Sequence, residues 1–335
     1  MGKVCILGLG GWGTAIAVPL TDAGSEVVVW GRRSEAVESF NRTGCNERYL
    51  PGIQLKGVRA TVDLLDALRG AEVVVVAVPS LAAREVCRRA AEVLASSPGR
   101  SRPTVLSTCK GLEPGTRKRI SSVVAEEMGS LIKGVAVVSG PNFATEVARR
   151  LPTATVVASA EIEIASDIRD RLMTPSFRVY VNLDVTGVEI AGALKNVIAI
   201  AVGISDGLGL GYNARAALIT RGLAEMARLG EALGANKLTF SGLAGLGDLV
   251  LTCTGEYSRN RRAGQAIARG QTLEEFVRST GALVEGAQTT REAVALADSL
   301  GVQMPVAREV YQILFEGKPP ADVVWDIMTR EKKTE

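Results

Sequence analysis

The first half of this chain of 335 residues alternates short apolar runs with longer amphipathic stretches. The runs are rich in β-branched residues, apolar on both faces and too short for helices, which is typical of strands buried in a parallel sheet. Segments with helical spacing, such as 15–22 and 82–95, lie between them. This order predicts a doubly wound α/β domain. The predicted strands are 4–7, 27–30, 73–78, 105–107, 135–138 and 155–158.

The sequence pattern changes near residue 187. Ala-rich and Leu-rich segments with helical spacing follow one another, mostly separated by Gly, Pro or Asn, and none has the pattern of a strand. We therefore expect an α/β domain at 1–186 and an all-helical domain at 187–330. The predicted helices of the second domain are 189–204, 214–233, 262–268, 273–279, 289–300, 306–316 and 321–328.

A glycine-rich loop follows the first predicted strand and precedes a predicted helix at 14–22. Its residues Gly8, Gly10 and Gly13 fit the GxGxxG pattern of dinucleotide-binding loops. In that pattern the first glycine permits a tight turn, the second lets the backbone approach a pyrophosphate, and the third lets the helix pack on the strand. The helix N-terminus attracts the anion. This context predicts a Rossmann-type dinucleotide site, against the alternative of a plain glycine-rich turn.

The end of the second predicted strand indicates which dinucleotide binds. An NAD site usually has Asp or Glu there to hold the ribose 2′-hydroxyl, whereas this strand is followed by Arg32 and Arg33. A guanidinium suits a 2′-phosphate by its charge and its bidentate hydrogen bonds. We expect NADP(H) as the preferred cofactor and NAD(H) as the second choice. The structural alternative is that one or both arginines are solvated surface residues.

The chain contains no histidine, so proton transfer must use Lys, Asp, Glu, Tyr or Cys. Lys195 lies in the apolar segment 189–204. Its neighbours at helical spacing are all apolar or small: Ala191, Gly192, Ile198 and Ala199. Partial burial lowers a lysine pKa toward neutrality, where the group exchanges protons usefully. Lys195 is therefore the expected general acid/base, with a lysine that reaches solvent as the alternative.

Other polar residues occur in glycine-rich contexts. Lys110 and the segment 140–142 each follow a predicted strand, where doubly wound folds bind ligands. Asp248 ends a glycine-rich loop at 242–248, and three arginines accompany Ser and Asn at 258–262. Such a basic cluster suits a phosphate or a carboxylate. The structural alternatives are turn glycines, a capping Asp and a solvated basic face.

Composition narrows the function classes further. The net charge of +3 gives no support to nucleic-acid binding, which requires clustered Lys and Arg. The five cysteines form no CxxC pair, which argues against a disulfide framework or a zinc ribbon and fits a reducing cytosol. We find no signal peptide and no apolar run of the ~20 residues that a spanning helix needs. We therefore expect a cytoplasmic protein that is not embedded in a membrane and binds no metal.

A series of short motifs spans nearly the whole chain. They are GLGGWGTA at 8–15, YLPG at 49–52, AVPS at 77–80, STCKGL at 107–112, GPNFATE at 140–146, ALKN at 193–196, GLAGLGDL at 242–249, SRNRRAG at 258–264 and VEG at 284–286. Each motif is modest alone, but together and in this order they resemble the bacterial-type NAD(P)-dependent glycerol-3-phosphate dehydrogenases. The resemblance implies a helical domain like that of 6-phosphogluconate dehydrogenase. It also implies reversible reduction of dihydroxyacetone phosphate to sn-glycerol 3-phosphate for glycerophospholipid synthesis.

The resemblance also implies roles for single residues. Lys195 matches the family's proton donor and acceptor, and Lys110 matches a lysine that touches both cofactor and substrate; with Asp248 they form the expected catalytic set. Positions that match substrate binding are Lys110, Gly140, Asn142, Lys195, Asp248, Ser258, Arg259 and Asn260. Positions that match cofactor binding, beside the three loop glycines, are Gly11, Trp12, Arg32, Arg33, Lys110, Ala144, Arg259, Leu283 and Glu285.

Three of these positions depart from the family's pattern. Gly11 stands where the family often has Ser or Ala, Asn142 where it often has Ser, and Leu283 where many members have Val. We expect Gly11 and Asn142 to act through backbone atoms and Leu283 to preserve an apolar contact.

Two other functions are weighed against this one. A β-hydroxyacid dehydrogenase also joins a Rossmann domain to a helical domain and uses a lysine, but it would lack the GLAGLGDL and SRNRR segments. A dinucleotide-sensing protein without catalysis would not need Lys195 on an apolar face, nor Lys110 and Asp248. The expected partner is a small molecule, dihydroxyacetone phosphate or sn-glycerol 3-phosphate. The oligomeric state is left open between a monomer and a homodimer.

Overall fold

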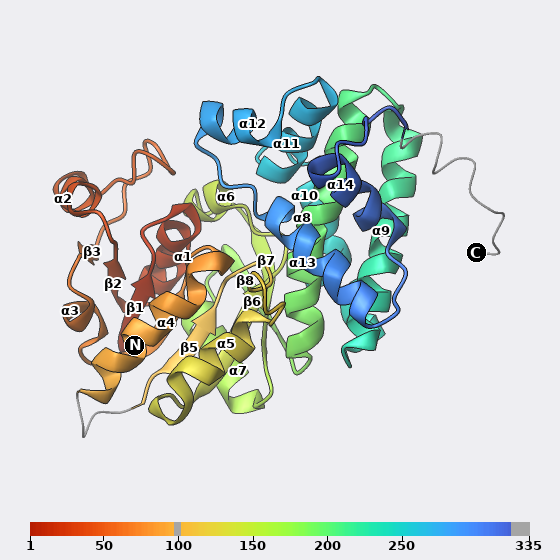
Figure 1. Ribbon diagram of the computed structural model, residues 1–335. Helices are drawn as coiled ribbons and strands as arrows, with labels where there is room; N and C mark the ends of the chain where they lie inside the picture. The colour runs from red at the N-terminus through yellow and green to blue at the C-terminus, as the bar shows by residue number, and fades with distance from the viewer. Residues whose placement is uncertain (97–101, 323–335) are drawn as a thin grey trace.

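The computed structural model describes residues 1–96 and 102–322. An eight-stranded sheet domain forms the first part of the chain and a group of helices forms the second (Figure 1). The strand order in the sheet is β3-β2-β1-β4-β5-β6-β7-β8. The strands are β1 (Lys3–Leu7), β2 (Glu26–Trp30), β3 (Val58–Thr61), β4 (Ala71–Val76), β5 (Thr104–Ser107), β6 (Gly134–Ser139), β7 (Thr153–Ser159) and β8 (Phe177–Asn182).

All the predicted strands form, but the sequence missed β3 and β8 at the two edges of the sheet. Each of these strands leaves some of its side chains exposed, so neither shows the continuous apolar run of a strand buried on both faces. The sheet is also mixed, because β6 and β7 pair antiparallel, with Val137 opposite Ala158. The other neighbouring strands pair parallel. The expectation of a wholly parallel sheet was therefore wrong at this one pair.

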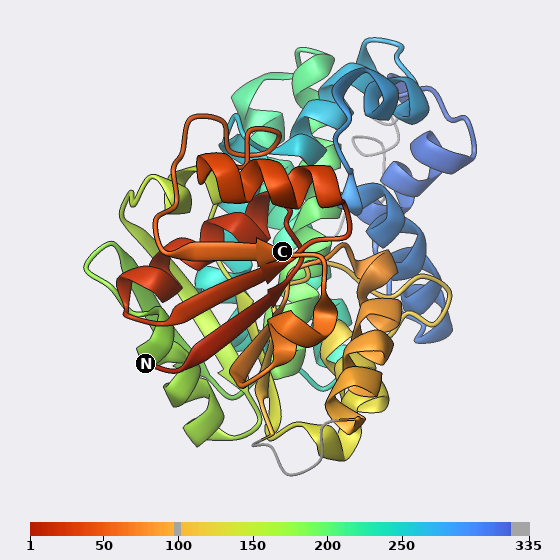
Figure 2. The same cartoon turned by 90° about the vertical axis from the view of Figure 1, so that its left-hand side faces the viewer.

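Helices cover both faces of the sheet, because successive residues of a strand point to opposite faces. Val4 and Ile6 pack with α1, α2 and α7 on one face, whereas Cys5 and Leu7 pack with α3, α4 and α5 on the other. Figure 2 shows the first strands side by side between these helices. The helices are α1 (Gly11–Asp22), α2 (Ser34–Thr43), α3 (Leu64–Leu68), α4 (Ser80–Ala95), α5 (Ile120–Met128), η1 (Gly129–Leu131), α6 (Ala144–Ala148) and α7 (Ile162–Leu172).

The helical part is built around α8 (Val185–Gly207), whose residues 187–205 are all buried. Asp184 caps this helix, since its carboxylate accepts a hydrogen bond of 2.8 Å from the Gly187 N–H. By length and composition α8 could cross a membrane, which corrects the expectation that no apolar run has that length. However, 94% of its apolar window is buried inside the protein, so α8 is the core helix of this domain.

The other helices of this part pack around α8 (Figure 1). They are α9 (Gly211–Ala232), η2 (Lys237–Ser241), η3 (Leu243–Gly247), α10 (Asp248–Thr254), α11 (Arg259–Ala268), α12 (Leu273–Thr280), α13 (Glu285–Ser299) and α14 (Pro305–Phe315). As predicted, the described part of 187–322 contains no strand. The predicted boundary between 186 and 187 falls within the first turn of α8. Most of the predicted helix at 321–328 lies outside the described residues.

Helices α8 and α11 pack backbone against backbone. A Cβ atom at Gly203 would lie 2.0 Å from the Arg261 carbonyl oxygen, and one at Gly264 would lie 2.2 Å from the Ile200 carbonyl oxygen. Both distances are too short for any side chain, so the two glycines let the helices approach. The N-terminus of α11, which carries Ser258 and Arg259, is placed by this contact.

We expect Gly203→Ala to lower the free energy of unfolding by about 1–3 kcal/mol, because the added methyl group must push α11 away from α8. Urea denaturation measures this change. Ala224→Ser, at an exposed position of α9, is the control and should leave stability unchanged. A Gly203→Ala protein as stable as wild type would show that the two helices are not in contact at this point.

Candidate active site

The glycine-rich loop joins β1 to α1 at the carboxyl edge of the sheet. Gly8 has a φ of 129°, and a Cβ atom there would lie 2.4 Å from the Ala77 carbonyl oxygen. A Cβ at Gly13 would lie 2.0 Å from the Gly8 carbonyl oxygen. A Cβ at Gly10, in contrast, would meet no described atom within 4 Å, so this side of the loop is open to a ligand. The geometry matches the predicted division of roles among the three glycines.

The N-terminus of α1 fits an anionic cofactor. Its N-cap residue is Gly10, and among the described residues no side chain caps it. The N–H groups of the first turn, from Gly11 onward, therefore lack the partner that a capping side chain would supply, and they favour an anion such as a pyrophosphate. Arg32 and Arg33 are exposed where β2 ends and α2 begins.

The remaining predicted cofactor positions come from separate elements. Trp12 is half-buried, and the Lys110 ammonium lies 6.0 Å from its ring centre. Ala144 and Glu285 are the first residues of α6 and α13, and Leu283 is exposed just before α13. Burial raises the pKa of the Glu285 carboxyl, and the positive charges of nearby Arg259, Lys110 and Lys195 oppose that effect.

Lys195 is only 5% exposed on α8, so it does not reach solvent as the alternative proposed. Its Nζ donates a hydrogen bond of 2.9 Å to Thr252 Oγ1 and another to Asp248 Oδ1. Burial lowers the pKa of Lys195 to about 7, although the Asp248 carboxylate opposes the change. A lysine with such a pKa can give a proton as the ammonium and take one as the amine near neutrality.

Asp248 lies between two lysines. Its Oδ2 accepts a hydrogen bond of 2.9 Å from Lys110 Nζ, while its Oδ1 binds Lys195. Burial by itself would raise the pKa of this carboxyl, but the Lys110 and Lys195 ammonium groups hold it below its ordinary value. Asp248 is therefore ionised, and it ties the α/β domain to the helical domain.

The surroundings of Asp248 differ from the sequence-based expectation. The segment predicted as a glycine-rich loop is the π-helical turn η3, and Asp248 is the first residue of α10 rather than the end of a loop. The N-cap of α10 is Gly247, so Asp248 is not a capping residue. Its fully buried carboxylate faces the two lysines instead.

The segment after β6 reaches Lys110 through a side chain and a carbonyl. Lys110 Nζ donates hydrogen bonds to Asn142 Oδ1 at 2.7 Å and to the Gly140 carbonyl oxygen at 3.2 Å. Asn142 Nδ2 in turn donates to Thr155 Oγ1 at 3.0 Å. Asn142 thus has a side-chain contact that the sequence did not predict, because its amide oxygen binds the Lys110 ammonium, while its expected backbone contact with the substrate stays a prediction.

The residues of the arginine-rich motif at 258–262 differ in their partners and in their exposure. Ser258 caps α11, because its Oγ accepts a hydrogen bond from the Arg261 N–H at 3.2 Å. Arg261 pairs with Asp206, at 2.7 Å between Nε and Oδ2. Arg259, at the first position of α11, and Arg262 are both exposed. The motif thus presents one helix N-terminus with the exposed Arg259 at its first position.

Asn260 belongs to a chain of amide contacts that runs back to Lys110. Asn260 accepts from the Gly286 N–H at 3.0 Å and donates to Asn196 Oδ1 at 2.8 Å. Asn196 Nδ2 then donates to the Lys110 carbonyl oxygen at 3.2 Å. This chain links α13, α11 and α8 to the segment that carries Lys110.

Sequence reasoning missed three residues around this site. Thr252 was missed because α10 was not predicted, although it lies one turn after Asp248 and so on the same helix face. Asn196 occurs in the sequence-based prediction only as the last residue of the ALKN motif. Glu189 is a buried carboxylate on α8 that accepts hydrogen bonds from Arg119 at 2.9 Å and from the Ser121 N–H at 2.8 Å. A polar residue in an apolar helix was the signal that could have found it.

Comparisons with known proteins agree with this architecture. The family models described as NAD-dependent glycerol-3-phosphate dehydrogenase N-terminus and C-terminus match residues 3–165 and 184–325. Relatives named glycerol-3-phosphate dehydrogenase (NAD(P)+) from Geobacillus thermodenitrificans and Moorella thermoacetica are each 50% identical. The matches cover 100% and 99% of this chain, and 97% of each relative. A solved glycerol-3-phosphate dehydrogenase from Coxiella burnetii is 42% identical with a TM-score of 0.91, over 98% of this chain and 99% of that one.

Proposed function

The chain belongs to the NAD-dependent glycerol-3-phosphate dehydrogenase family, whose members reduce dihydroxyacetone phosphate to sn-glycerol 3-phosphate reversibly with NAD(P)H, and we propose that its paired lysines serve the proton transfer of this reaction. The observation that carries this proposal is the buried contact of Lys195 and Lys110 with one carboxylate, that of Asp248. Family membership separates the chain from the β-hydroxyacid dehydrogenases. A sensor without catalysis would gain nothing from a lysine buried in this way.

The lysines account for the proton chemistry of this reaction. The dinucleotide, when bound, supplies the hydride. Negative charge develops on the ketone oxygen, and the Lys195 ammonium stabilises that charge and donates the proton. In the reverse direction the neutral Lys195 amine accepts a proton from the hydroxyl group. Asp248 holds Lys195 in place, and Lys110 adds a second positive charge.

The N-terminus of α11 is our candidate for holding the substrate phosphate. It offers backbone N–H groups and the positive end of a helix dipole, and Arg259 stands exposed beside it. Asn260 connects this end of the helix to α8 and thus to Lys195. Binding of the phosphate there would hold the carbonyl group near the lysines, which contributes by positioning.

The test of the function follows the absorbance of NADPH in the presence of dihydroxyacetone phosphate. We expect substrate-dependent oxidation that stops when the ketone is consumed, and formation of sn-glycerol 3-phosphate. Small 2-hydroxy and 3-hydroxy acids with NADP+ should give no turnover. Turnover of a hydroxy acid, with none of dihydroxyacetone phosphate, would assign the chain to the other enzyme class.

The cofactor preference rests on Arg32 and Arg33. We expect the Arg32→Ser, Arg33→Ser double variant to lose ~10-fold or more in kcat/KM with NADPH, because each charge-assisted bond to a phosphate contributes roughly 1.5–3 kcal/mol. The value with NADH should change far less. Arg42→Ser, at an exposed position at the other end of α2, is the control. Equal losses with both cofactors would show that the two arginines do not bind the 2′-phosphate.

The proposed setting is the cytoplasm, where the product would serve glycerophospholipid synthesis. All five cysteines are free, as a reducing compartment requires. The proposed partner is the small substrate.

A further inference from the structure

The segment 108–119, which joins β5 to α5 and carries Lys110, is held by both domains. The Lys110 carbonyl oxygen accepts from Asn196 on α8. Leu112 is buried in the hydrophobic core of the helical domain. At the far end of the segment, Arg119 pairs with Glu189 of α8 at 2.9 Å. The position of Lys110 therefore depends on how this whole segment is fixed.

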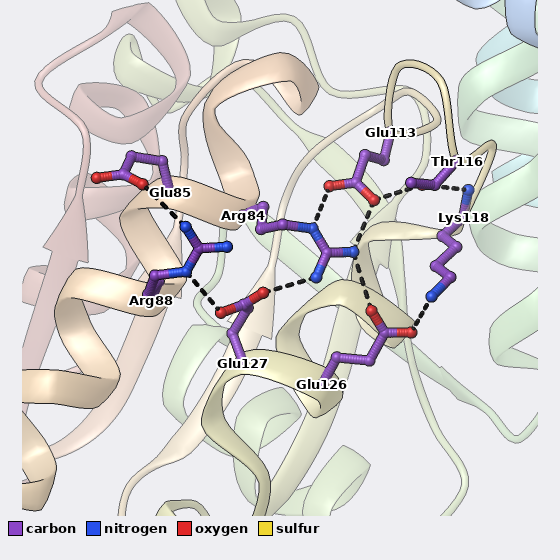
Figure 3. A network of polar contacts seen from close by, with 8 residues as sticks. All are labelled: Arg84, Glu85, Arg88, Glu113, Thr116, Lys118, Glu126 and Glu127. Carbon is purple, nitrogen blue, oxygen red and sulfur yellow. Dashed lines mark hydrogen bonds and ion pairs between the residues drawn. The ribbon is translucent and has the colours of Figure 1, made fainter.

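Glu113 fixes the middle of the segment to α4 (Figure 3). Its two carboxylate oxygens accept from Arg84 Nε at 2.6 Å and from Arg84 Nη2 at 2.7 Å, which is a bidentate ion pair. Glu113 is only 7% exposed, and Thr116 Oγ1 also donates to it. The backbone of Glu113 closes the turn as well, because its N–H donates to the Lys118 carbonyl oxygen at 2.9 Å.

The first turns of α4 also belong to the surroundings of the site. Arg84 lies one turn after Ser80, the first residue of α4. A Cβ at Gly111 would lie 2.8 Å from Ser80 Oγ and 3.4 Å from Thr289 Oγ1, so the segment runs tightly between α4 and α13. The ion pair of Glu113 with Arg84 therefore lies two residues along the chain from Gly111 and three residues from Lys110.

We propose that Glu113, held by Arg84, is a positioning residue that keeps the Lys110 ammonium between Asn142 and Asp248. This inference rests on the proposed function, because it concerns a lysine of the proposed site. Arg84 has other partners, Glu126 and Glu127 of α5. Glu126 also binds Lys118 near the far end of the segment 108–119, whereas Glu127 contacts Arg84 and Arg88, both on α4. The network in Figure 3 thus holds the segment at Glu113, three residues from Lys110, and again at Lys118.

The ion pair of Glu113 with Arg84 has an electrostatic consequence that a purely structural contact would not have. The charged groups around Lys195 are Asp248 on α10, Lys110, and Glu285 on α13. The nearby Lys110 ammonium contributes to the lowered pKa of Lys195 and shares Asp248 with it. If the segment is no longer held, the Lys110 ammonium moves away from Asp248. The Asp248 carboxylate then pairs with Lys195 alone. The pKa of Lys195 then rises, and reduction stays active to higher pH.

The test compares Glu113→Ala with Glu127→Ala. Both variants remove one carboxylate from the same Arg84, but Glu113 belongs to the segment 108–119, whereas Glu127 of α5 contacts Arg84 and Arg88 of α4. We expect Glu113→Ala to lower kcat/KM for dihydroxyacetone phosphate by ~10- to 10²-fold, as small misplacements of reacting groups do. Its pH profile should shift upward. Glu127→Ala should keep the activity and the pH profile of wild type.

Two further measurements decide the remaining outcomes. Glu113→Gln keeps a side-chain oxygen that can accept from Arg84, so it should have most of the wild-type activity. This variant can be measured even if Glu113→Ala does not fold. Competitive acetylation of Lys195, followed by mass spectrometry over a range of pH, reports the pKa of Lys195 without turnover. It therefore tests the role of Glu113 even if the wild-type protein fails to reduce dihydroxyacetone phosphate. Equal kinetics of the two alanine variants, or a pKa of Lys195 in Glu113→Ala equal to that of wild type, would overturn the inference.

Discussion

Lys195→Met will give a folded protein that binds NADPH but reduces dihydroxyacetone phosphate with a kcat at least ~10²-fold lower. Methionine nearly conserves the length and the apolar stem of lysine while it removes the proton and the charge. Loss of general-acid help costs ~10²–10⁴-fold, and loss of the charge that stabilises the developing alkoxide adds to this. Turnover is measured by NADPH absorbance, and cofactor binding by fluorescence titration.

Stability should respond differently from activity in the Lys195→Met protein. A buried ammonium is poorly solvated, and its removal relieves that cost. Asp248 keeps its ion pair with Lys110, at 2.9 Å, so no carboxylate is left without a partner. We expect a melting temperature near that of wild type. Lys133→Met, at an exposed position, controls for the substitution itself. A kcat within ~10-fold of wild type would remove Lys195 as the acid/base, since general acid catalysis contributes more than that, and Lys110 would be the next candidate.

The Asp248→Asn variant will lose most of its activity in the reduction of dihydroxyacetone phosphate at neutral pH and regain part of it at acidic pH. In wild type the pKa of Lys195 is about 7, and Asp248 opposes the lowering caused by burial. Without the carboxylate the pKa of Lys195 falls further, so the proton that reduction needs is lost at a lower pH. A charge-assisted hydrogen bond contributes roughly 1.5–3 kcal/mol, which corresponds to ~10- to 10²-fold in kcat/KM above neutrality. The pH dependence of kcat/KM measures the shift, because it reports groups of the free enzyme.

The matched control for this variant is Asp206→Asn. Asp206 is also buried, and it pairs with Arg215 and Arg261 near the C-terminal end of α8. Its replacement should lower the melting temperature without moving the pH profile. If Asp248→Asn kept the wild-type profile, or moved it to higher pH, Asp248 would not act on the proton of Lys195.

The elements that the sequence predicted well are those whose pattern is local. Residues that follow one another along β1, the glycine loop and α1 predict a strand, a turn and a helix, because the GxGxxG spacing lies within one short stretch of the sequence. The burial of Lys195 was visible in the same way, since helical spacing alone surrounds it with Ala191, Gly192 and Ile198. These predictions needed no contact between distant parts of the chain.

The sheet edges and one strand direction were not predictable from the patterns used. β3 and β8 expose some of their side chains to solvent, so they lack the continuous apolar run that marks the central strands. The antiparallel pairing of β6 with β7 was hidden for a different reason. Both strands are largely buried, and such a strand has the same residue pattern whichever way it runs.

The site itself was decided by the tertiary structure. Lys110 and Asp248 are 138 positions apart in the chain, and Lys195 and Asp248 are 53 apart, yet one carboxylate binds both lysines. The sequence marked each residue singly and did not show that one carboxylate joins the two lysines. Only the packing of α8 and α10 against the segment after β5 places three charges together in a buried space. The charges of Asp248 and Lys110 act on the pKa of Lys195 in opposite directions, and a local sequence pattern does not carry that long-range effect.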